Sequence, residues 1–337
     1  MSGPSGEGRF ALGDFEVESG ETIANASVAW KTFGALSPAK DNVILYPTSY
    51  SATDAELAWA VGPDRILDSS RWFVIIPNMF GNGVSSSPSN TPGYPSLVTT
   101  ADNVRAQRRL LGDVFGIERL ACVYGFSMGA QQAYHWAALY PDRVERIAVV
   151  CGSARTAVHN RVFLLSVASI LEAAPEHLGR GRFSTPPVAA LRAFGRSYAA
   201  WAMSQDFYRE GLYLSVLGAE SLDHFLKTQW EDRFAARDAA NLYAQLQTWI
   251  TSDISANALY GFDLATALGA ITARVLLMPS RTDLYFRVAD NEAEMPHLQS
   301  AELAPIPSIW GHRAGNPVQS PEDARFLRER VGRLLAD

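Results

Sequence analysis

The fold of this chain is decided by the stretch Leu120-Ala-Cys-Val-Tyr-Gly-Phe-Ser-Met-Gly129. Its first half is an apolar run typical of a buried strand, and a helical pattern follows over 128–140 and ends at Pro141. A Gly-x-Ser-x-Gly sequence between a strand and a helix predicts a tight turn that exposes the serine. Ser127 then lies at a helix N-terminus, where free N–H groups favour a developing negative charge. The stretch therefore predicts a nucleophilic serine.

Strands and helices alternate around this turn. Apolar runs at 42–46, 71–77, 120–124, 147–151 and 273–278 predict buried strands, and two shorter strands precede them at 15–17 and 26–30. Helical patterns cover 54–67, 100–111, 128–140 and 321–335. Such alternation predicts an α/β fold with a doubly wound, mostly parallel sheet that carries helices on both faces.

One long segment departs from this alternation. From residue 156 to residue 258 the chain is helical in character and contains no convincing strand. Strand and helix patterns return after it. We therefore predict a core formed by residues 1–155 and 259–337, with an inserted helical lid at 156–258.

Composition limits the partners and the location. The net charge of -6 argues against nucleic acid, which requires a concentrated basic surface. No run approaches the roughly 18 apolar residues that span a bilayer, and the polar N-terminus lacks the apolar centre of a secretion signal. We therefore predict a cytoplasmic protein with no membrane partner. Cys122 and Cys151 lie in apolar runs as expected of buried thiols, and no Cys/His cluster indicates a metal or a cofactor.

A serine hydroxyl needs a base, and the base needs an orienting acid. In hydrolases with this strand–serine–helix turn, the acid and then the histidine follow the serine along the chain. His312 lies in a glycine-flanked loop near the C-terminus, and Asp283 follows the strand at 273–278. His297 and Asp290 are the alternatives. We predict a Ser-His-Asp triad of Ser127, His312 and Asp283.

The remaining site residues follow from the same turn. The backbone N–H of Met128 is expected to be one oxyanion donor. The second is expected from the loop after the strand at 42–46, with Ser49 as first choice and Tyr50 as the alternative. Apolar side chains lie in the motifs around the site. We predict that Tyr50, Phe126 and Trp310 line the substrate pocket.

Several motifs together resemble the homoserine O-acetyltransferase family of the α/β-hydrolase fold. They are the segments 15–22, 30–34, 104–111, 116–120, 127–129, 140–144 and 233–243. The resemblance covers most of the chain and implies a parallel-sheet core with a helical lid. It also implies a homodimer formed through the lid, and the same triad of Ser127, Asp283 and His312.

The departures from that family concern the substrate. In that family the turn around the serine, here called the elbow (residues 125–130), reads Gly-Gly-Ser-Met-Gly-Gly, and Phe126 and Ala130 replace two of its glycines. The loop at 47–51 replaces a His-Ala-Leu-Thr-Gly stretch. Arg313 replaces an aspartate that is expected to hold the amino group of homoserine, and an arginine would repel that group. Arg192 and Arg196 are the residues that could bind an acceptor's carboxylate.

These features favour a carboxylic-ester hydrolase that acts on short-chain acyl esters. The alternative is an O-acyltransferase that moves acetyl or a similar group from acyl-CoA, as co-substrate, to a hydroxyl acceptor such as homoserine. A third class, a binding protein without catalysis, is disfavoured by the intact set of serine, acid and histidine. The expected partner is a small-molecule ester.

Overall fold

The computed structural model describes residues 6–336; the first five residues of the polar N-terminus, on which the prediction of no secretion signal partly rests, lie outside them. The described chain forms one eight-stranded sheet in the order β1-β2-β4-β3-β5-β6-β7-β8. The six strands β3 to β8 run parallel, and β1 and β2 are antiparallel to their neighbours. The strands are β1 (Glu7–Glu16), β2 (Thr22–Phe33), β3 (Val43–Leu45), β4 (Phe73–Pro77), β5 (Cys122–Phe126), β6 (Arg146–Val150), β7 (Arg274–Met278) and β8 (Ala301–Leu303).

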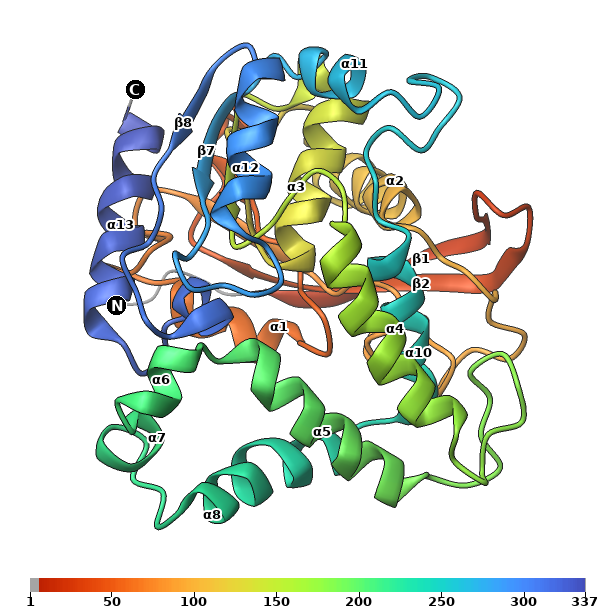
Figure 1. Cartoon of the computed structure of the whole chain (residues 1–337). Coiled ribbons are helices and arrows are strands. Elements are labelled where there is room, and N and C mark those ends of the chain that lie inside the picture. Colours follow the sequence, from red (N-terminus) through yellow and green to blue (C-terminus); the bar gives the residue numbers. More distant parts are fainter. Residues whose placement is uncertain (1–5, 337) are drawn as a thin grey trace.

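Helices cover both faces of the sheet (Figure 1). On one face the apolar core includes side chains of α2, α3 and α11, and on the other those of α1 and α13. This arrangement confirms the predicted doubly wound α/β fold. The helices are α1 (Asp54–Leu57), α2 (Thr100–Leu110), α3 (Met128–Leu139), α4 (Val158–Glu172), α5 (Val188–Ala202), α6 (Gln205–Arg209), α7 (Leu212–Ser215), α8 (Leu222–Leu226), α9 (Asp232–Ala235), α10 (Ala239–Ile250), α11 (Leu264–Gly269), α12 (Val288–Glu294) and α13 (Pro321–Ala336).

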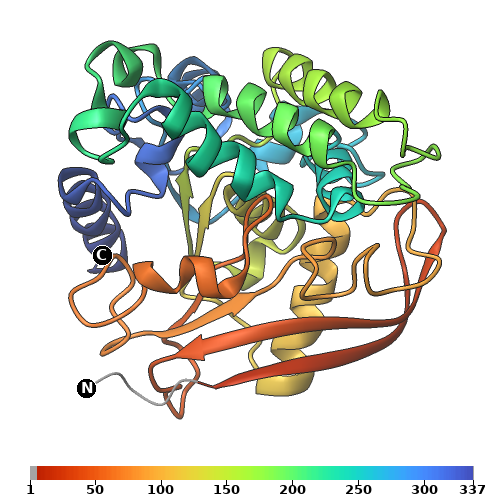
Figure 2. The ribbon, with the colours of Figure 1, turned by 90° about the horizontal axis from the view of Figure 1, so that it is seen from below.

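The first two strands are longer than their sequence indicates. β1 and β2 form a hairpin that runs as a long ribbon along one side of the molecule, with the helices between β6 and β7 on the opposite side (Figure 2). Many of their side chains are exposed, and apolar residues alternate with polar ones. A strand that is half solvated contains no continuous apolar run, so only its most buried parts are visible in the sequence.

The segment between β6 and β7 is helical, from α4 to α10. Its aromatic and aliphatic side chains form a separate core that also includes Tyr50, Met128, Tyr285 and Phe286 of the sheet domain. Most of these four lie just beyond the carboxyl ends of strands, so the helices cover that edge of the sheet. The domain limits at 155/156 and 258/259 stay a prediction.

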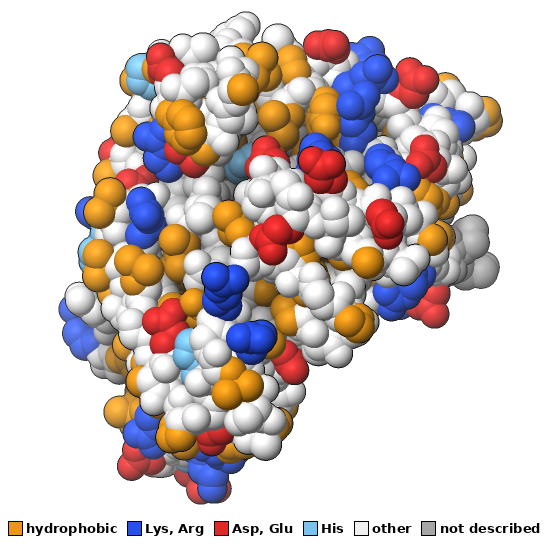
Figure 3. All heavy atoms as spheres, turned by 90° about the vertical axis from the view of Figure 1, so that its right-hand side faces the viewer, with side chains coloured by type: hydrophobic (Ala, Val, Ile, Leu, Met, Phe, Trp, Pro, Cys, Tyr) orange, Lys and Arg blue, Asp and Glu red, His pale blue; other side chains and the backbone are white. Residues whose placement is uncertain are grey.

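The surface carries charges of both signs. On the face shown in Figure 3, basic and acidic side chains are interspersed, and hydrophobic ones lie scattered among them. On α4, the apolar side chains of Val158, Val162 and Leu165 are exposed. The predicted homodimer stays a prediction. In the part of the chain that the structure describes, no helix has both the length and the apolar character needed to cross a bilayer.

Candidate active site

Ser127 occupies the turn between β5 and α3 in a strained backbone conformation, with φ 58° and ψ −125°. This region is unfavourable for a residue with a side chain and is maintained only when the surroundings enforce it. The turn is so tight that a Cβ at Gly125 would lie 2.2 Å from the carbonyl oxygen of Gly129. Likewise, a Cβ at Gly129 would lie 2.7 Å from the Pro47 carbonyl oxygen. Both glycines are therefore required for the turn to close.

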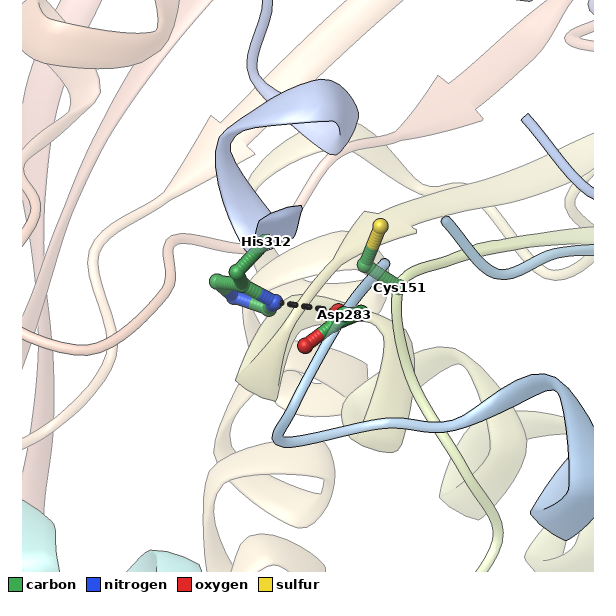
Figure 4. A group of neighbouring side chains, drawn as sticks. All are labelled: Cys151, Asp283 and His312. Atoms are coloured by element: carbon green, nitrogen blue, oxygen red, sulfur yellow. Dashed lines mark hydrogen bonds and ion pairs between the residues drawn. The ribbon is translucent and has the colours of Figure 1, made fainter. Parts of the chain in front are cut away.

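The structure brings Ser127, His312 and Asp283 into one hydrogen-bonded row. The Nε2 atom of His312 lies 2.9 Å from the Ser127 Oγ atom, and its Nδ1 atom lies 2.7 Å from Asp283 Oδ2. All three side chains are buried. Figure 4 shows the bond between His312 and Asp283. This geometry allows the imidazole to accept the serine proton while the carboxylate orients it.

Asp283 is oriented by the backbone beside it. Its Oδ1 atom accepts hydrogen bonds from the N–H groups of Tyr285 (2.7 Å) and Phe286 (3.3 Å), which leaves Oδ2 for His312. Asp290, the alternative acid, accepts instead from the N–H of Arg287 at the start of α12. His297, the alternative base, lies in a short turn after α12.

The histidine loop is held by the helical segment. Gly311 has φ 63°, and a Cβ there would lie 2.7 Å from the backbone nitrogen of Ser204. The Ser204 hydroxyl also donates a hydrogen bond to the Ile309 carbonyl oxygen. His312 is thus positioned by contacts with residues about 100 positions earlier in the chain.

Phe126 and Ala130, the two elbow residues that replace glycines of the related family, each pack against a glycine elsewhere in the chain. The Phe126 ring lies 4.8 Å from the His312 ring, centroid to centroid. It fits there because residue 315 is a glycine, whose added Cβ would lie 2.6 Å from that ring. Ala130 faces Gly152, where an added Cβ would lie 2.3 Å from the Ala130 methyl group. Glycines at 152 and 315 therefore accommodate the larger residues at 130 and 126.

Backbone N–H groups without an acceptor lie next to Ser127, both in the elbow and in the loop after β3. Among residues 6–336, the N–H groups of Met128, Ser49 and Tyr50 have no hydrogen-bond acceptor. The Ser49 hydroxyl donates to the Phe126 carbonyl oxygen, which joins this loop to the elbow. The arrangement leaves one donor after the serine and one in the loop, as an oxyanion hole requires. It does not separate Ser49 from Tyr50.

A small cavity of about 80 Å³ opens over Ser127 and His312. Two of the residues predicted to bind substrate, Tyr50 and Phe126, line it. The third, Trp310, lines an adjoining cavity of about 40 Å³. Side chains from the helical segment complete the main cavity: Tyr198, Ala202, Trp230, Arg233 and Phe234.

Arg192 and Arg196 lie elsewhere and are already paired. Arg192 contacts Asp232 at 2.7 Å and Glu231 at 3.5 Å, and Arg196 contacts Glu231. Neither residue lines the cavity over Ser127. Since their charges are met by carboxylates of the protein, the structure does not support them as carboxylate ligands.

Known proteins resemble this chain over most of its length. The model of the α/β hydrolase fold family matches residues 59–304. The chain belongs to the α/β-hydrolase fold family. An ethyl acetate hydrolase of Pseudomonas veronii is 37% identical over 309 residues, which are 89% of this chain and 87% of that protein. The solved acetyl esterase MekB superposes with a TM-score of 0.94 at 34% identity, covering 98% of this chain and 97% of that one.

A homoserine O-acetyltransferase of Symbiobacterium thermophilum is 30% identical over 361 residues, or 93% of this chain and 91% of that protein. This α/β-hydrolase is therefore an enzyme related to both groups and more similar in sequence to the esterases. The predicted resemblance is confirmed, including its expected position among esterase-like members.

Cys151 of this α/β-hydrolase lies beside Asp283, a contact that the sequence did not predict. It directly follows β6, and its Sγ atom lies within 4.8 Å of the ligand atoms of both Asp283 and His312 (Figure 4). Burial raises the pKa of its thiol, so it stays neutral. A metal ion between these groups would have to break the Asp283–His312 bond. The place of Cys151 in the sequence, directly after a predicted parallel strand, could have indicated this contact, because the carboxyl ends of neighbouring parallel strands converge on the site.

A buried carboxyl group lies behind the elbow of the hydrolase. Glu294 accepts hydrogen bonds from the Tyr134 hydroxyl, the Ala154 N–H and the Asn291 amide, all at 2.7–2.8 Å. Burial nevertheless raises its pKa to about 7, because desolvation outweighs these bonds. Asn291 also donates to the carbonyl oxygen of Gly152, which packs against the elbow. The group therefore supports the elbow from the side away from the substrate.

The Glu294→Gln variant should remove a pH dependence of stability. Since the folded-state pKa of Glu294 is raised to about 7 from 4.5, its favourable contribution is fully present below pH 4.5. It declines as the pH rises through 7, by up to about 3 kcal/mol. Urea unfolding at pH 5 and pH 8 should show a larger loss of stability for the wild type than for the variant. Equal losses would contradict the prediction.

Proposed function

We propose that this hydrolase cleaves short-chain carboxylic esters through an acyl-enzyme on Ser127. The observation that carries the proposal is the row Ser127–His312–Asp283, with separations of 2.9 and 2.7 Å, at the base of a small cavity. The names of the related ethyl acetate hydrolase and acetyl esterase agree with a small acyl group.

In the proposed first half-reaction, His312 Nε2 takes the proton of the Ser127 hydroxyl as Oγ attacks the ester carbonyl carbon. The negative charge on the carbonyl oxygen is received by the N–H groups of Met128 and of Ser49 or Tyr50. Asp283 stabilises the imidazolium without taking its proton. The imidazolium then protonates the departing alkoxide, and the acyl group stays on Ser127.

In the second half-reaction, water takes the place of the alcohol. His312 removes a proton from the water, the resulting oxygen attacks the acyl carbon, and Ser127 regains its proton as the acid leaves. Transfer to a hydroxyl acceptor would use the same steps with the acceptor in place of water. Acyl transfer is the second candidate because a homoserine O-acetyltransferase is 30% identical to this chain.

One experiment separates the two candidates. Purified protein is incubated with p-nitrophenyl acetate or acetyl-CoA, each with and without homoserine, and nitrophenol, free CoA and acetylated product are measured. We expect ester hydrolysis without acetyl-homoserine. Release of CoA that depends on homoserine would support acyl transfer instead. A series of p-nitrophenyl esters should lose kcat/KM from acetate to octanoate, because the cavity of about 80 Å³ is below the usual size for larger ligands. Faster cleavage of octanoate would contradict the short-chain proposal.

A further inference from the structure

Three polar side chains of the cavity over Ser127 have atoms without a partner. Within residues 6–336, the Arg313 guanidinium contacts no carboxylate and donates no hydrogen bond, although it is half-buried. The indole N–H of Trp230 and the amide oxygen of Asn316 are buried and also lack a hydrogen-bond partner. Trp230 is only 8% exposed. Buried polar groups are nearly always hydrogen-bonded, so these atoms in the cavity wall are available to pair with a bound molecule.

The charge in this region is unbalanced. Arg233, which also lines the cavity, and Arg237 share a single carboxylate, that of Glu56. Arg313 contacts no carboxylate among the described residues, and the carboxylate that acts on it electrostatically is the same Glu56. Desolvation, and then repulsion from Arg233, lowers the pKa of Arg313 to about 10. The guanidinium is still charged at neutral pH, so the cavity has an excess of positive charge.

The positive charges of Arg313 and Arg233 act inside the cavity over Ser127. Both Arg313 and Arg233 act electrostatically on the Tyr198 hydroxyl, which lines the same space. Both arginines also line the adjoining cavity with Trp230. They therefore lie on the boundary between the two spaces, within reach of a ligand bound over Ser127.

We propose that this cavity takes esters that carry a carboxylate a few bonds from the ester carbonyl, and that Arg313 binds this carboxylate. A planar guanidinium can donate two parallel N–H bonds to one carboxylate. The Trp230 N–H supplies a further donor, and the Asn316 amide presents its NH₂ after rotation about Cβ–Cγ. A substrate carboxylate would pair with a half-buried guanidinium that no carboxylate of residues 6–336 contacts. The same charge excludes ammonium groups.

This inference rests on the proposed ester hydrolysis and names its substrate class. The carboxylate takes no part in bond making, so the reaction stays ester plus water to acid plus alcohol. It can belong to the acyl group or to the alcohol. The small cavity limits the distance between the carboxylate and the ester, since both must fit beside Ser127.

The test compares charged esters with neutral amides of the same shape. Monoethyl succinate and ethyl succinamate place the group on the acyl side; 3-acetoxypropanoate and 3-acetoxypropanamide place it on the alcohol side. For at least one pair, the wild type should prefer the charged ester in kcat/KM by roughly 10- to 100-fold, as expected for hydrogen bonds to a charged group. The preferred pair identifies the side that carries the carboxylate.

Variants then assign the preference. In Arg313→Gln the ratio of charged to neutral ester should fall close to one, and Arg313→Lys should give an intermediate ratio. Trp230→Phe should reduce the ratio several-fold. The control Arg192→Gln removes an arginine that is paired outside the cavity and should keep the wild-type ratio. Folding of each variant is checked by its melting temperature.

Other outcomes would overturn the inference. A wild type that hydrolyses the neutral esters at least as well as the charged ones has no carboxylate site here. The same conclusion follows if Arg313→Gln keeps the wild-type ratio. If neither the four esters nor p-nitrophenyl acetate is hydrolysed, the proposed function itself is wrong, and the inference is wrong with it.

Discussion

Replacing Ser127 with alanine is expected to lower kcat for p-nitrophenyl acetate by a factor of about 10⁴ to 10⁶. The substitution removes only the Oγ atom, whose hydrogen bond in the described structure is with His312. Without it no acyl-enzyme forms, and only binding and the oxyanion donors can accelerate attack by water. The fold should persist, because alanine tolerates the turn no worse than serine does.

The measurement is steady-state turnover, together with the burst of nitrophenol that a trapped acyl-enzyme produces. The matched control is Ser153→Ala, which removes another buried serine hydroxyl, one that donates to the Arg155 carbonyl oxygen. This control should keep turnover within a few-fold of the wild type. If Ser127→Ala keeps more than a tenth of the wild-type kcat, Ser127 is not the nucleophile.

Asp283→Asn is expected to lower kcat by about 10⁴, with little change in structure. The oxygen of the new amide should replace Oδ1, because that atom accepts from the N–H groups of Tyr285 and Phe286. The NH₂ group then faces Nδ1 of His312, where the carboxylate oxygen stood. It can only donate, so the imidazole must carry its proton on Nε2, the atom that has to accept from Ser127.

The control for this variant is Asp290→Asn, which changes the alternative acid. Asp290 accepts from the Arg287 N–H at the start of α12, and an asparagine can keep that bond. Its kcat should stay within a few-fold of the wild-type value. The opposite pattern, with a large loss for Asp290→Asn and a small one for Asp283→Asn, would assign the acid to Asp290.

The residues around the elbow could be located from the sequence because the determining features are local. A strand, a Gly-x-Ser-x-Gly turn and a helix are contiguous from residue 122 to residue 139, and such a turn closes only with glycines at 125 and 129. His312 and Asp283 could be chosen because each lies in a loop at a predictable place along the chain. Parallel strands bring such loops to one edge of the sheet, so the row of three side chains follows.

Other features depend on contacts that no local pattern encodes. Cys151 and Glu294 read as ordinary core or surface residues, and only packing places the first beside Asp283 and the second behind the elbow. Trp310 was expected in the substrate pocket, but packing places it in the adjoining cavity. In the sequence, Arg192 and Arg196 of α5 looked free to bind a ligand, but they pair with the carboxylates of Asp232 and Glu231 at the start of α9.

The sequence by itself determined the class of the fold, a mostly parallel sheet covered by helices, and the turn that holds Ser127. It also predicted that Ser127, His312 and Asp283 act together, because these features follow from short-range backbone geometry and from chain order. The tertiary structure alone decided which charges are left unpaired around that chemistry. Whether an arginine is neutralised depends on which carboxylate lies within a few ångströms, and that is set by the packing of a helical segment about 80 residues away from Arg313. We therefore expect the substrate class to depend on the assembled cavity, and the proposed acyl-enzyme chemistry to depend on the motif.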